Sequence, residues 1–427
     1  MIIEKINSIL WGVGTILLIF GTGIFFSVKI GFKQLNIVNI LKKTLLLKSE
    51  KSENTGTLTR FQALSTALAA SMGTGNIIGV AAAITIGGAG SIFWMWVSAI
   101  FSMAIAYAEN YLGVLYKKRT GSKTAGAMLY LENGLKSKPL SVLFAVSAIF
   151  VSLSMGNTVQ SNAIALSADT FGIPHFITGL IISAGAGLIL FGGAACIAKA
   201  SERIIPFVSG VYIIGCLIAI FMNLNGLPAV FAGICKGAFG IDAVTGAVSG
   251  LMIRQAVTTG LRRGIFSNEA GMGSSVFVHT ETDCKDPDTM GSWAILEVFI
   301  DTILCCSLTA FVILLTVGGN SDGVNIVFAA FGSVFGSFAE KFVAVCTILF
   351  AFATLIGWSY YGEKSLKYVI KRNSAPTVFR IIYIILIAVG AVINTSFLWG
   401  ISDIFNALML LINIFGILFL SREVKKH

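Results

Sequence analysis

Apolar stretches of about 20 residues recur along the whole chain, and they constrain the fold more than any other feature. Each stretch is long enough to cross about 30 Å of hydrocarbon as a helix. Of the 427 residues, 56% are hydrophobic and only 12% are charged, which is too few charges for the surface of a soluble protein of this size. The sequence therefore predicts an all-α polytopic membrane protein in which residues 1–427 form one transmembrane domain.

The apolar stretches define eleven predicted spans joined by mostly short loops. The first stretch has no basic leader and no small-residue cleavage site, so it is interpreted as a retained helix rather than as a signal peptide. The predicted spans are 9–28, 58–86, 91–115, 139–166, 175–197, 204–222, 228–265, 290–316, 338–361, 377–395 and 399–420.

The net charge of +10 follows the expected topology and not a nucleic-acid surface. If the N-terminus lies outside, most Lys and Arg residues fall in inside loops, Arg262 and Arg263 among them, and only Lys5, Lys236 and Lys341 fall outside. This bias is the positive-inside rule. It predicts an N-out, C-in protein that spans the lipid bilayer of the cell membrane many times, in a prokaryote the inner membrane, and that does not bind nucleic acid.

The second stretch contains SMGTGNIIG (71–79), which places Gly73, Thr74, Gly75 and Asn76 near the bilayer midplane. Glycine in a helix interior costs about 1 kcal/mol relative to alanine, and a polar amide in hydrocarbon needs partners. We therefore expect the helix to break here and its backbone to contact a ligand. A surface for helix packing would explain Gly75 and Gly79, but it would not require Asn76.

A second break is predicted in 228–265, which is too long for one span and is interrupted by GAFGIDAVTGAVSG (237–250). If 9–28 is an additional N-terminal helix, the two breaks fall in the first and sixth of ten core spans. Halves with an odd number of helices have opposite topology, so 58–222 and 228–420 are predicted to be inverted repeats. Paired breaks of this kind indicate a transport site.

A broken helix offers a ligand two kinds of backbone group. The half that ends near Met72 presents free carbonyls, which favour a cation, and the half that starts at Asn76 presents free N–H groups, which favour a carboxylate. Together they suit a zwitterion, or Na⁺ with an anionic group.

Four other polar or aromatic residues are predicted at membrane depth. Gln160 either reaches the ligand or pairs two helices, and Thr354 and Trp358 lie one turn apart on one helical face. Asp301 lies about 18 Å along its helix from the inner loop, so we expect a functional or a paired carboxylate. Its expected partner in a buried ion pair is Arg254.

The remaining motifs give weaker signals. RRGIFSNEAGMGSS (262–275) is predicted to be a polar loop at the inner mouth, where Gly271 and Gly273 offer hinges for a gate. The seven cysteines and three histidines show no ligand spacing, so no metal other than Na⁺ and no cofactor are expected. No catalytic motif argues for an enzyme, and no segment indicates an obligatory protein partner.

Four long motifs, 61–96, 263–274, 298–306 and 350–363, closely resemble the alanine/glycine:cation symporters, also called the sodium:alanine symporter family. Weaker likeness at 9–34, 126–135 and 192–207 extends the resemblance to nearly the whole chain. The resemblance implies a LeuT-type 5+5 inverted repeat with one additional N-terminal helix. It also implies Na⁺-coupled uptake of L-alanine or glycine by alternating access.

The resemblance also implies site residues. It places substrate contacts at Asn76, Gln160, Thr354 and Trp358, and more loosely on the backbone of the sixth core helix. With the first break, the predicted substrate-binding residues are Gly73, Thr74, Gly75, Asn76, Gln160, Thr245, Gly246, Gly250, Thr354 and Trp358, and the predicted cation-binding residues are Ala69, Met72 and Thr354.

Two positions depart from the family's usual residues, and they leave alternatives for the coupled ion and for the transported amino acid. Ala353 stands where the family usually has Thr or Ser, and Ala89 stands where it usually has Pro. Leu251, Met252 and Trp358 are expected to form a small apolar pocket, in which one methylene is worth only about 1–3 kcal/mol. A proton-coupled symporter, or one for another neutral amino acid such as glutamine, is therefore an alternative. An ion channel or a non-transporting membrane sensor is another, although antiparallel halves do not suit a channel.

Overall fold

The computed structural model describes residues 2–46, 58–122, 124–240, 246–318, 325–393 and 396–425. Within these ranges the regular structure is helical, with one isolated bridge between Leu58 and Thr282. The predicted all-α class is therefore confirmed.

The helices vary from single turns to 32 residues. Up to residue 222 they are α1 (Ile2–Leu10), α2 (Val13–Lys29), η1 (Lys33–Leu35), α3 (Ile37–Leu46), α4 (Arg60–Ser71), η2 (Thr74–Asn76), α5 (Ile78–Gly87), α6 (Gly90–Thr120), α7 (Met128–Asn133), α8 (Lys138–Leu153), η3 (Ser154–Val159), α9 (Gln160–Ala168), η4 (Asp169–Phe171), α10 (His175–Phe191) and α11 (Gly193–Met222). Beyond it they are η5 (Leu224–Gly226), α12 (Leu227–Phe239), α13 (Gly246–Asn268), α14 (Val276–His279), α15 (Pro287–Val298), η6 (Phe299–Cys306), α16 (Ser307–Thr316), α17 (Asn325–Phe335), α18 (Phe338–Val369), α19 (Ala375–Val392), α20 (Ser396–Phe419) and η7 (Ser421–Glu423).

Several of these helices are long and apolar enough to cross a membrane. The described residues contain eight such helices, or nine if α4 and α5, which are bent by 62° at their junction, form one broken span. α10 is one of three shorter apolar helices. Each predicted span overlaps a helix or a helix pair, while the total of eleven spans, the orientation and the repeat boundaries stay predictions.

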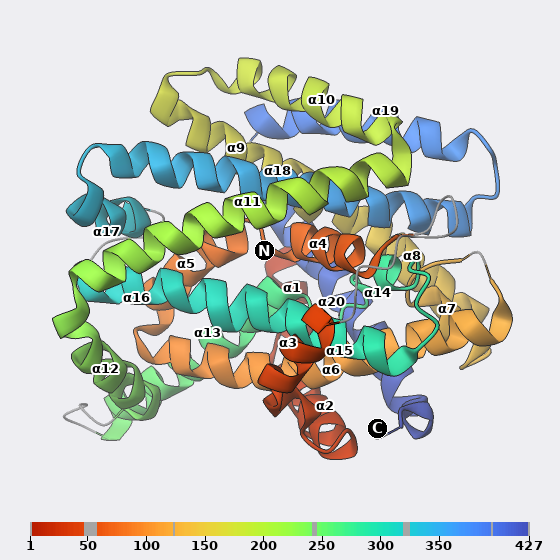
Figure 1. Ribbon diagram of the computed structural model, residues 1–427, viewed down its shortest axis with the longest axis horizontal. Coiled ribbons are helices and arrows are strands. Elements are labelled where there is room, and N and C mark those ends of the chain that lie inside the picture. The colour runs from red at the N-terminus through yellow and green to blue at the C-terminus, as the bar shows by residue number, and fades with distance from the viewer. Residues whose placement is uncertain are drawn as a thin grey trace.

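The broken pair α4–α5 lies at the centre of the molecule. α10 and α19 lie side by side along one edge, and α2 packs on α6 at the opposite edge (Figure 1). Between these edges, α4 packs against α11 and α18, and α13 packs against α5 and α6. The turn η2 between α4 and α5 contacts α13, η6 and α18. The first predicted break therefore meets three other helical segments.

Local sequence explains how these helices begin and how closely they pack. Thr59 caps α4 by accepting from the Gln62 amide at 3.1 Å, while the Gln62 side chain accepts from the Thr59 amide at 3.1 Å. On α13, a Cβ on Gly260 would lie 2.2 Å from the Ser91 carbonyl oxygen of α6. Glycine at this position lets the two backbones approach, as small residues do between membrane helices.

Candidate functional site

The break between α4 and α5 leaves backbone groups without helical partners. Met72 closes the last turn of α4 by donating to the Leu68 carbonyl at 2.7 Å. The next amide, that of Gly73, donates to the Ser71 carbonyl at 2.9 Å, so the Ala69 carbonyl loses its expected helical donor. α5 begins at Ile78, two residues beyond the predicted start, and its first amides likewise lack intrahelical acceptors. The break therefore presents carbonyls from one half-helix and amides from the other.

Gly73 lies where α4, α9 and α18 meet. A Cβ at this residue would lie 2.6 Å from Oγ1 of Thr354 and 3.4 Å from Oε1 of Gln160. Gln160 donates through Nε2 to the Met155 carbonyl at 3.2 Å, but its buried Oε1 has no hydrogen-bond partner among the described residues. A buried acceptor without a donor costs about 1–3 kcal/mol. The space beside Gly73 therefore offers an acceptor to an incoming N–H group.

α12 ends at Phe239 and α13 begins at Gly246, so the interruption predicted within 237–250 is present. The break that faces the first one, however, lies at 269–275, beyond the end of α13. α13 continues to Asn268, and a buried turn then leads to α14. The backbone of this turn has positive φ angles, 53° at Glu269, 85° at Gly271 and 70° at Gly273. Right-handed helices have negative φ angles, so the helix is interrupted here. A Cβ on Gly75 would lie 3.7 Å from Cα of Ser267. The two helix breaks therefore face one another in the interior, and 267–275 is not a loop at the inner mouth.

Asp301 joins the two breaks through neutral partners. Its side chain accepts from Nδ2 of Asn76 at 2.8 Å, from Oγ of Ser267 at 2.8 Å and from Oγ1 of Thr302 at 2.7 Å. Asp301 and Asn76 are both fully buried, and Oδ1 of Asn76 has no partner among the described residues. An ionised carboxylate at this depth needs a compensating charge, so this cluster of oxygen atoms suits a cation.

Trp358 connects α18 to the second break. Its indole Nε1 donates to Oε1 of Glu269 at 3.1 Å, and the residue is fully buried. A Cβ on Gly156 would lie 2.3 Å from Cβ of Trp358, so a glycine is needed where α18 passes η3. This packing fixes the indole beside the turn that follows α13.

Two π-helical turns carry side chains of the site. Gln160 directly follows the π-turn η3, and Asp301 lies within the π-turn η6. A π-turn widens the backbone and is found mostly at functional sites. Apolar periodicity alone cannot reveal such a turn, because each π-turn continues an α-helical pattern on both sides.

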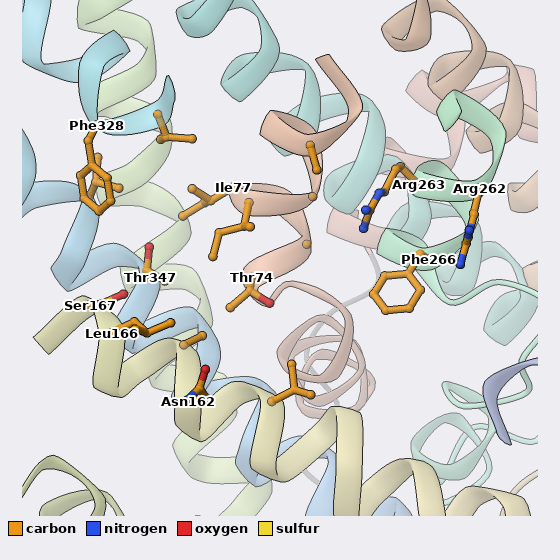
Figure 2. Close-up of a pocket in the computed structure, with 18 of the residues that line it drawn as sticks. Thr74, Ile77, Asn162, Leu166, Ser167, Arg262, Arg263, Phe266, Phe328 and Thr347 are labelled. Atoms are coloured by element: carbon orange, nitrogen blue, oxygen red, sulfur yellow. The ribbon is translucent and has the colours of Figure 1, made fainter. Parts of the chain in front are cut away.

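A cavity of about 620 Å³ lies on the α5 side of the two breaks. Its walls come from α5, α9, α13, α17, α18 and α20, and Thr74 and Gly75 line it beside the first break (Figure 2). Most lining side chains are apolar, and Arg262, Arg263 and Asp403 are its charged residues. Cavities of this size bind small molecules.

The structure brings most of the predicted site residues together and separates others from them. Seven of the predicted residues are buried around the two breaks, beside Thr74 and Gly75. They are Ala69, Met72, Gly73, Asn76, Gln160, Thr354 and Trp358. Gly246, at the first residue of α13, is about 33 Å along the helix from Asn268, at 1.5 Å per residue. Gly250 is exposed and does not line the cavity. These two predictions followed from the assumption that the interruption between α12 and α13 faces the site, and Thr245 lies outside the described residues.

The predicted ion pair between Arg254 and Asp301 is wrong. Arg254 is exposed on α13 and lies 13 residues before Ser267, or about 20 Å along the helix. Leu251 and Met252, at 65% and 57% exposure, likewise do not form a pocket with the buried Trp358.

The placement of two arginines also differs from expectation. Arg262 and Arg263 were assigned to an inside loop, but they lie on α13 and line the cavity together with residues of α5. The sequence pattern did not predict three further site residues, Ser267, Glu269 and Thr302. The signal for them was present, since the polar run Ser267–Glu269 is followed by two glycines within four residues.

A separate charged cluster joins three segments near the Leu58–Thr282 bridge. Glu281 accepts from Nζ of Lys117 at 3.1 Å and from Nζ of Lys364 at 2.8 Å. Burial raises the pKa of the Glu281 carboxyl, but the two lysines outweigh it and hold that pKa below its ordinary value of 4.5. These ion pairs tie α6 and α18 to the loop after α14.

Comparison with known proteins gives one consistent family. Residues 1–427 match the model of the sodium:alanine symporter family. The sodium/alanine symporter AgcS of Methanococcus maripaludis is 35% identical over 99% of this chain and 95% of its own length. The probable sodium/glutamine symporter GlnT of Bacillus subtilis is 36% identical over 98% of this chain and 87% of its own. The putative sodium/proton-dependent alanine carrier YrbD of Bacillus subtilis is 36% identical over 98% and 90%.

Solved structures support the fold. MhsT in complex with L-phenylalanine aligns with a TM-score of 0.62 at 12% identity, over 87% of this chain and 91% of its own. A Na⁺-coupled sialic acid symporter aligns with a TM-score of 0.56 at 13% identity, over 95% of this chain and 82% of its own. The LeuT-type fold predicted from the sequence is confirmed by these likenesses.

Proposed function

Because this chain belongs to the sodium:alanine symporter family, we propose that it takes up a small neutral amino acid, alanine or glycine, together with Na⁺ by alternating access. One observation carries the proposal: the helix breaks at 72–77 and 269–275 face each other around buried oxygen atoms that have no donor among the described residues. Unwound backbone at membrane depth is tolerated where it is buried or lines a cavity, and it is typical of transporter binding sites.

The groups around the first break match both charges of an amino acid. The amides at the start of α5 form a helix N-terminus, which favours the carboxylate. The unpartnered Oε1 of Gln160 and the hydroxyl of Thr354 lie beside Gly73 and are acceptors for the ammonium. Trp358 of α18 donates to Glu269 and so closes the site between α18 and the second break. The substrate-binding residues predicted in this region thus have complementary roles.

Two groups of oxygen atoms suit Na⁺. The first group is the one predicted from the sequence: backbone carbonyls at Ala69 and Met72, together with the Thr354 hydroxyl, which lies beside Gly73. The second surrounds Asp301, where a cation would neutralise a carboxylate whose partners are otherwise neutral. Oxygen ligands are those that hard cations prefer.

The position of the cavity indicates the side of the membrane from which the amino acid reaches the site. With the predicted N-out orientation, α5 runs toward the outside, so the cavity on the α5 side faces the medium. Closure of this cavity and opening on the α4 side would then complete the transport cycle. The predicted localisation, a multi-pass protein of the cell membrane, agrees with the apolar helices and the family.

Uptake into liposomes tests the proposal. Purified protein is reconstituted, and radiolabelled L-alanine, glycine and L-glutamine are offered with an inward Na⁺ gradient, with K⁺ in place of Na⁺, or with a pH gradient alone. We expect concentrative alanine or glycine uptake that requires Na⁺ and that Asn76→Ala abolishes. Uptake driven by the pH gradient alone, or of glutamine alone, would contradict the choice of ion or of substrate.

A further inference from the structure

The charges of the described residues that line the cavity do not balance. Among these residues, Arg262 and Arg263 bring two positive charges and Asp403 brings one negative charge. The other walls are mostly apolar, with residues such as Leu166, Phe266 and Phe328. The cavity therefore carries one net positive charge in surroundings that screen it poorly.

Arg262 already has its partners. Its Nη2 lies 3.5 Å from Oδ2 of Asp403, and its guanidinium lies over the ring of Trp11 at 5.7 Å. Trp11 also donates through Nε1 to the backbone carbonyl of Asp403 at 3.0 Å, which fixes both members of the pair. The α1–α2 junction thus holds the Arg262–Asp403 pair at the cavity wall.

Arg263 forms no ion pair within the described ranges, although its side chain is partly buried. The Asp403 carboxylate attracts it from a longer distance but is already paired with Arg262. In Figure 2 its guanidinium extends from α13 toward the side of the cavity that Thr74 and Ile77 line. Arginine at membrane depth is expensive to keep and indicates a function when it faces a cavity.

We propose that Arg263 binds the carboxylate of the amino acid when it enters the cavity, before the amino acid reaches the two helix breaks. This inference rests on the proposed function and adds an outer binding position to it. Arg263 lies one helical turn, about 6 Å, from Ser267, where α13 meets Gly75. A carboxylate released from Arg263 therefore has only a short distance to travel to the amides of α5.

The chemistry of the cavity favours this occupant. A guanidinium offers a planar pair of N–H donors that match a carboxylate, and apolar walls strengthen the attraction because they screen it less than bulk water does. The cavity volume of about 620 Å³ is in the range that holds drug-sized ligands, so it exceeds the needs of one alanine. An amino acid can thus bind at Arg263 without filling the central site.

The experiment compares Arg263→Gln and Arg263→Lys with the unmutated protein in liposomes. Initial rates of Na⁺-driven L-alanine uptake are measured over a range of alanine concentrations. We expect Arg263→Gln to raise KM about tenfold or more and to leave the maximal rate nearly unchanged. Arg263→Lys keeps the positive charge but loses the planar pair of N–H donors, so its KM should lie between those of the unmutated protein and Arg263→Gln. Arg203→Gln, the same change at an exposed residue outside the cavity lining, should leave KM unchanged.

A second arm separates the carboxylate from a small inorganic anion. Uptake is measured with isethionate in place of chloride for the unmutated protein and for Arg263→Gln. Independence of chloride in both is the expected result, and chloride-dependent uptake that Arg263→Gln removes would overturn the proposal. Thermal unfolding in detergent identifies a variant that fails to fold, and in that case Arg263→Lys decides. An unchanged KM in a folded variant also rejects the outer position.

Failure of the outer binding position can be distinguished from failure of the proposed transport function. If the unmutated protein shows no Na⁺-driven uptake, the function itself fails. The role of Arg263 is then decided by equilibrium binding of labelled alanine to detergent-solubilised protein. A tenfold weaker affinity in Arg263→Gln supports the outer position, and an equal affinity rejects it.

Discussion

Nδ2 of Asn76 donates to Oδ1 of Asp301 at 2.8 Å, and this hydrogen bond joins the break between α4 and α5 to the π-turn η6. The two residues are 225 positions apart in the chain, and both are fully buried. The bond links the predicted substrate site to a carboxylate that has no basic partner among its hydrogen bonds. A cation bound at Asp301 would therefore influence the conformation of the first break directly, through Asn76.

Asp301→Asn should weaken Na⁺ dependence. The variant retains a side chain of the same size but loses the negative charge, and hydrogen bonds or contacts to a charged group contribute about 1.5–3 kcal/mol. We expect the Na⁺ concentration for half-maximal alanine uptake to rise roughly tenfold or more. Asp169→Asn, at an exposed residue of η4, is the matched control. Equal Na⁺ dependence of the two variants would exclude a cation position at Asp301.

Gly73→Ala should abolish or strongly reduce uptake. The new Cβ would lie 2.6 Å from Oγ1 of Thr354, so either α18 or the break must move. Gly21→Ala is the control, because a Cβ there meets no atom within 4 Å and alanine favours the helix. Alanine uptake and thermal unfolding of both variants test the prediction. Normal uptake by Gly73→Ala would show that the break tolerates a side chain at this residue.

The first break could be predicted from sequence because its glycines and Asn76 interrupt an otherwise apolar span. The second could not be placed by the same signal, since 237–250 contains more glycine than 267–275. Glycines with positive φ occur in both segments, at Gly240 after α12 and at Gly271 and Gly273 after α13. Only the packing of the end of α13 beside η2 shows which of the two breaks faces the first, and glycine content does not express that packing.

The same error explains the failed ion pair and the missed residues. Because the C-terminal end of α13 faces the first break, and not its N-terminal end, Ser267 lies beside Asp301 and Arg254 lies far from it. Composition and charge predicted the all-α membrane class, which depends only on the balance of apolar and polar residues. The π-turns at Gln160 and Asp301 depend instead on how neighbouring helices pack, which one sequence does not express.

Trp358→Phe should lower uptake while keeping an aromatic ring at this buried position. The substitution removes the Nε1 donor that lies 3.1 Å from Oε1 of Glu269 and leaves this buried carboxyl with one donor fewer. The loss of such a donor costs about 1–3 kcal/mol, so we expect kcat/KM for alanine to fall at least about fivefold. Trp94→Phe is the matched control, because it removes an indole bond of 3.2 Å to the Ala238 carbonyl away from the site. An equal effect of both variants would contradict a specific role for the Trp358–Glu269 bond.

Stability should fall on acidification through the cluster of Glu281, Lys117 and Lys364. The two lysines hold the pKa of Glu281 below its ordinary value of 4.5, so the folded protein binds this proton more weakly than the unfolded chain. The contribution is therefore fully present above about pH 4.5 and is lost as the pH falls through the lower folded-state pKa. Glu281→Gln removes it at every pH, at a cost of about 1 kcal/mol or less for a partly exposed pair. Thermal unfolding in detergent between neutral and acidic pH should thus show a smaller acid-induced decrease for Glu281→Gln than for the unmutated protein, and parallel curves would argue against the role of Glu281.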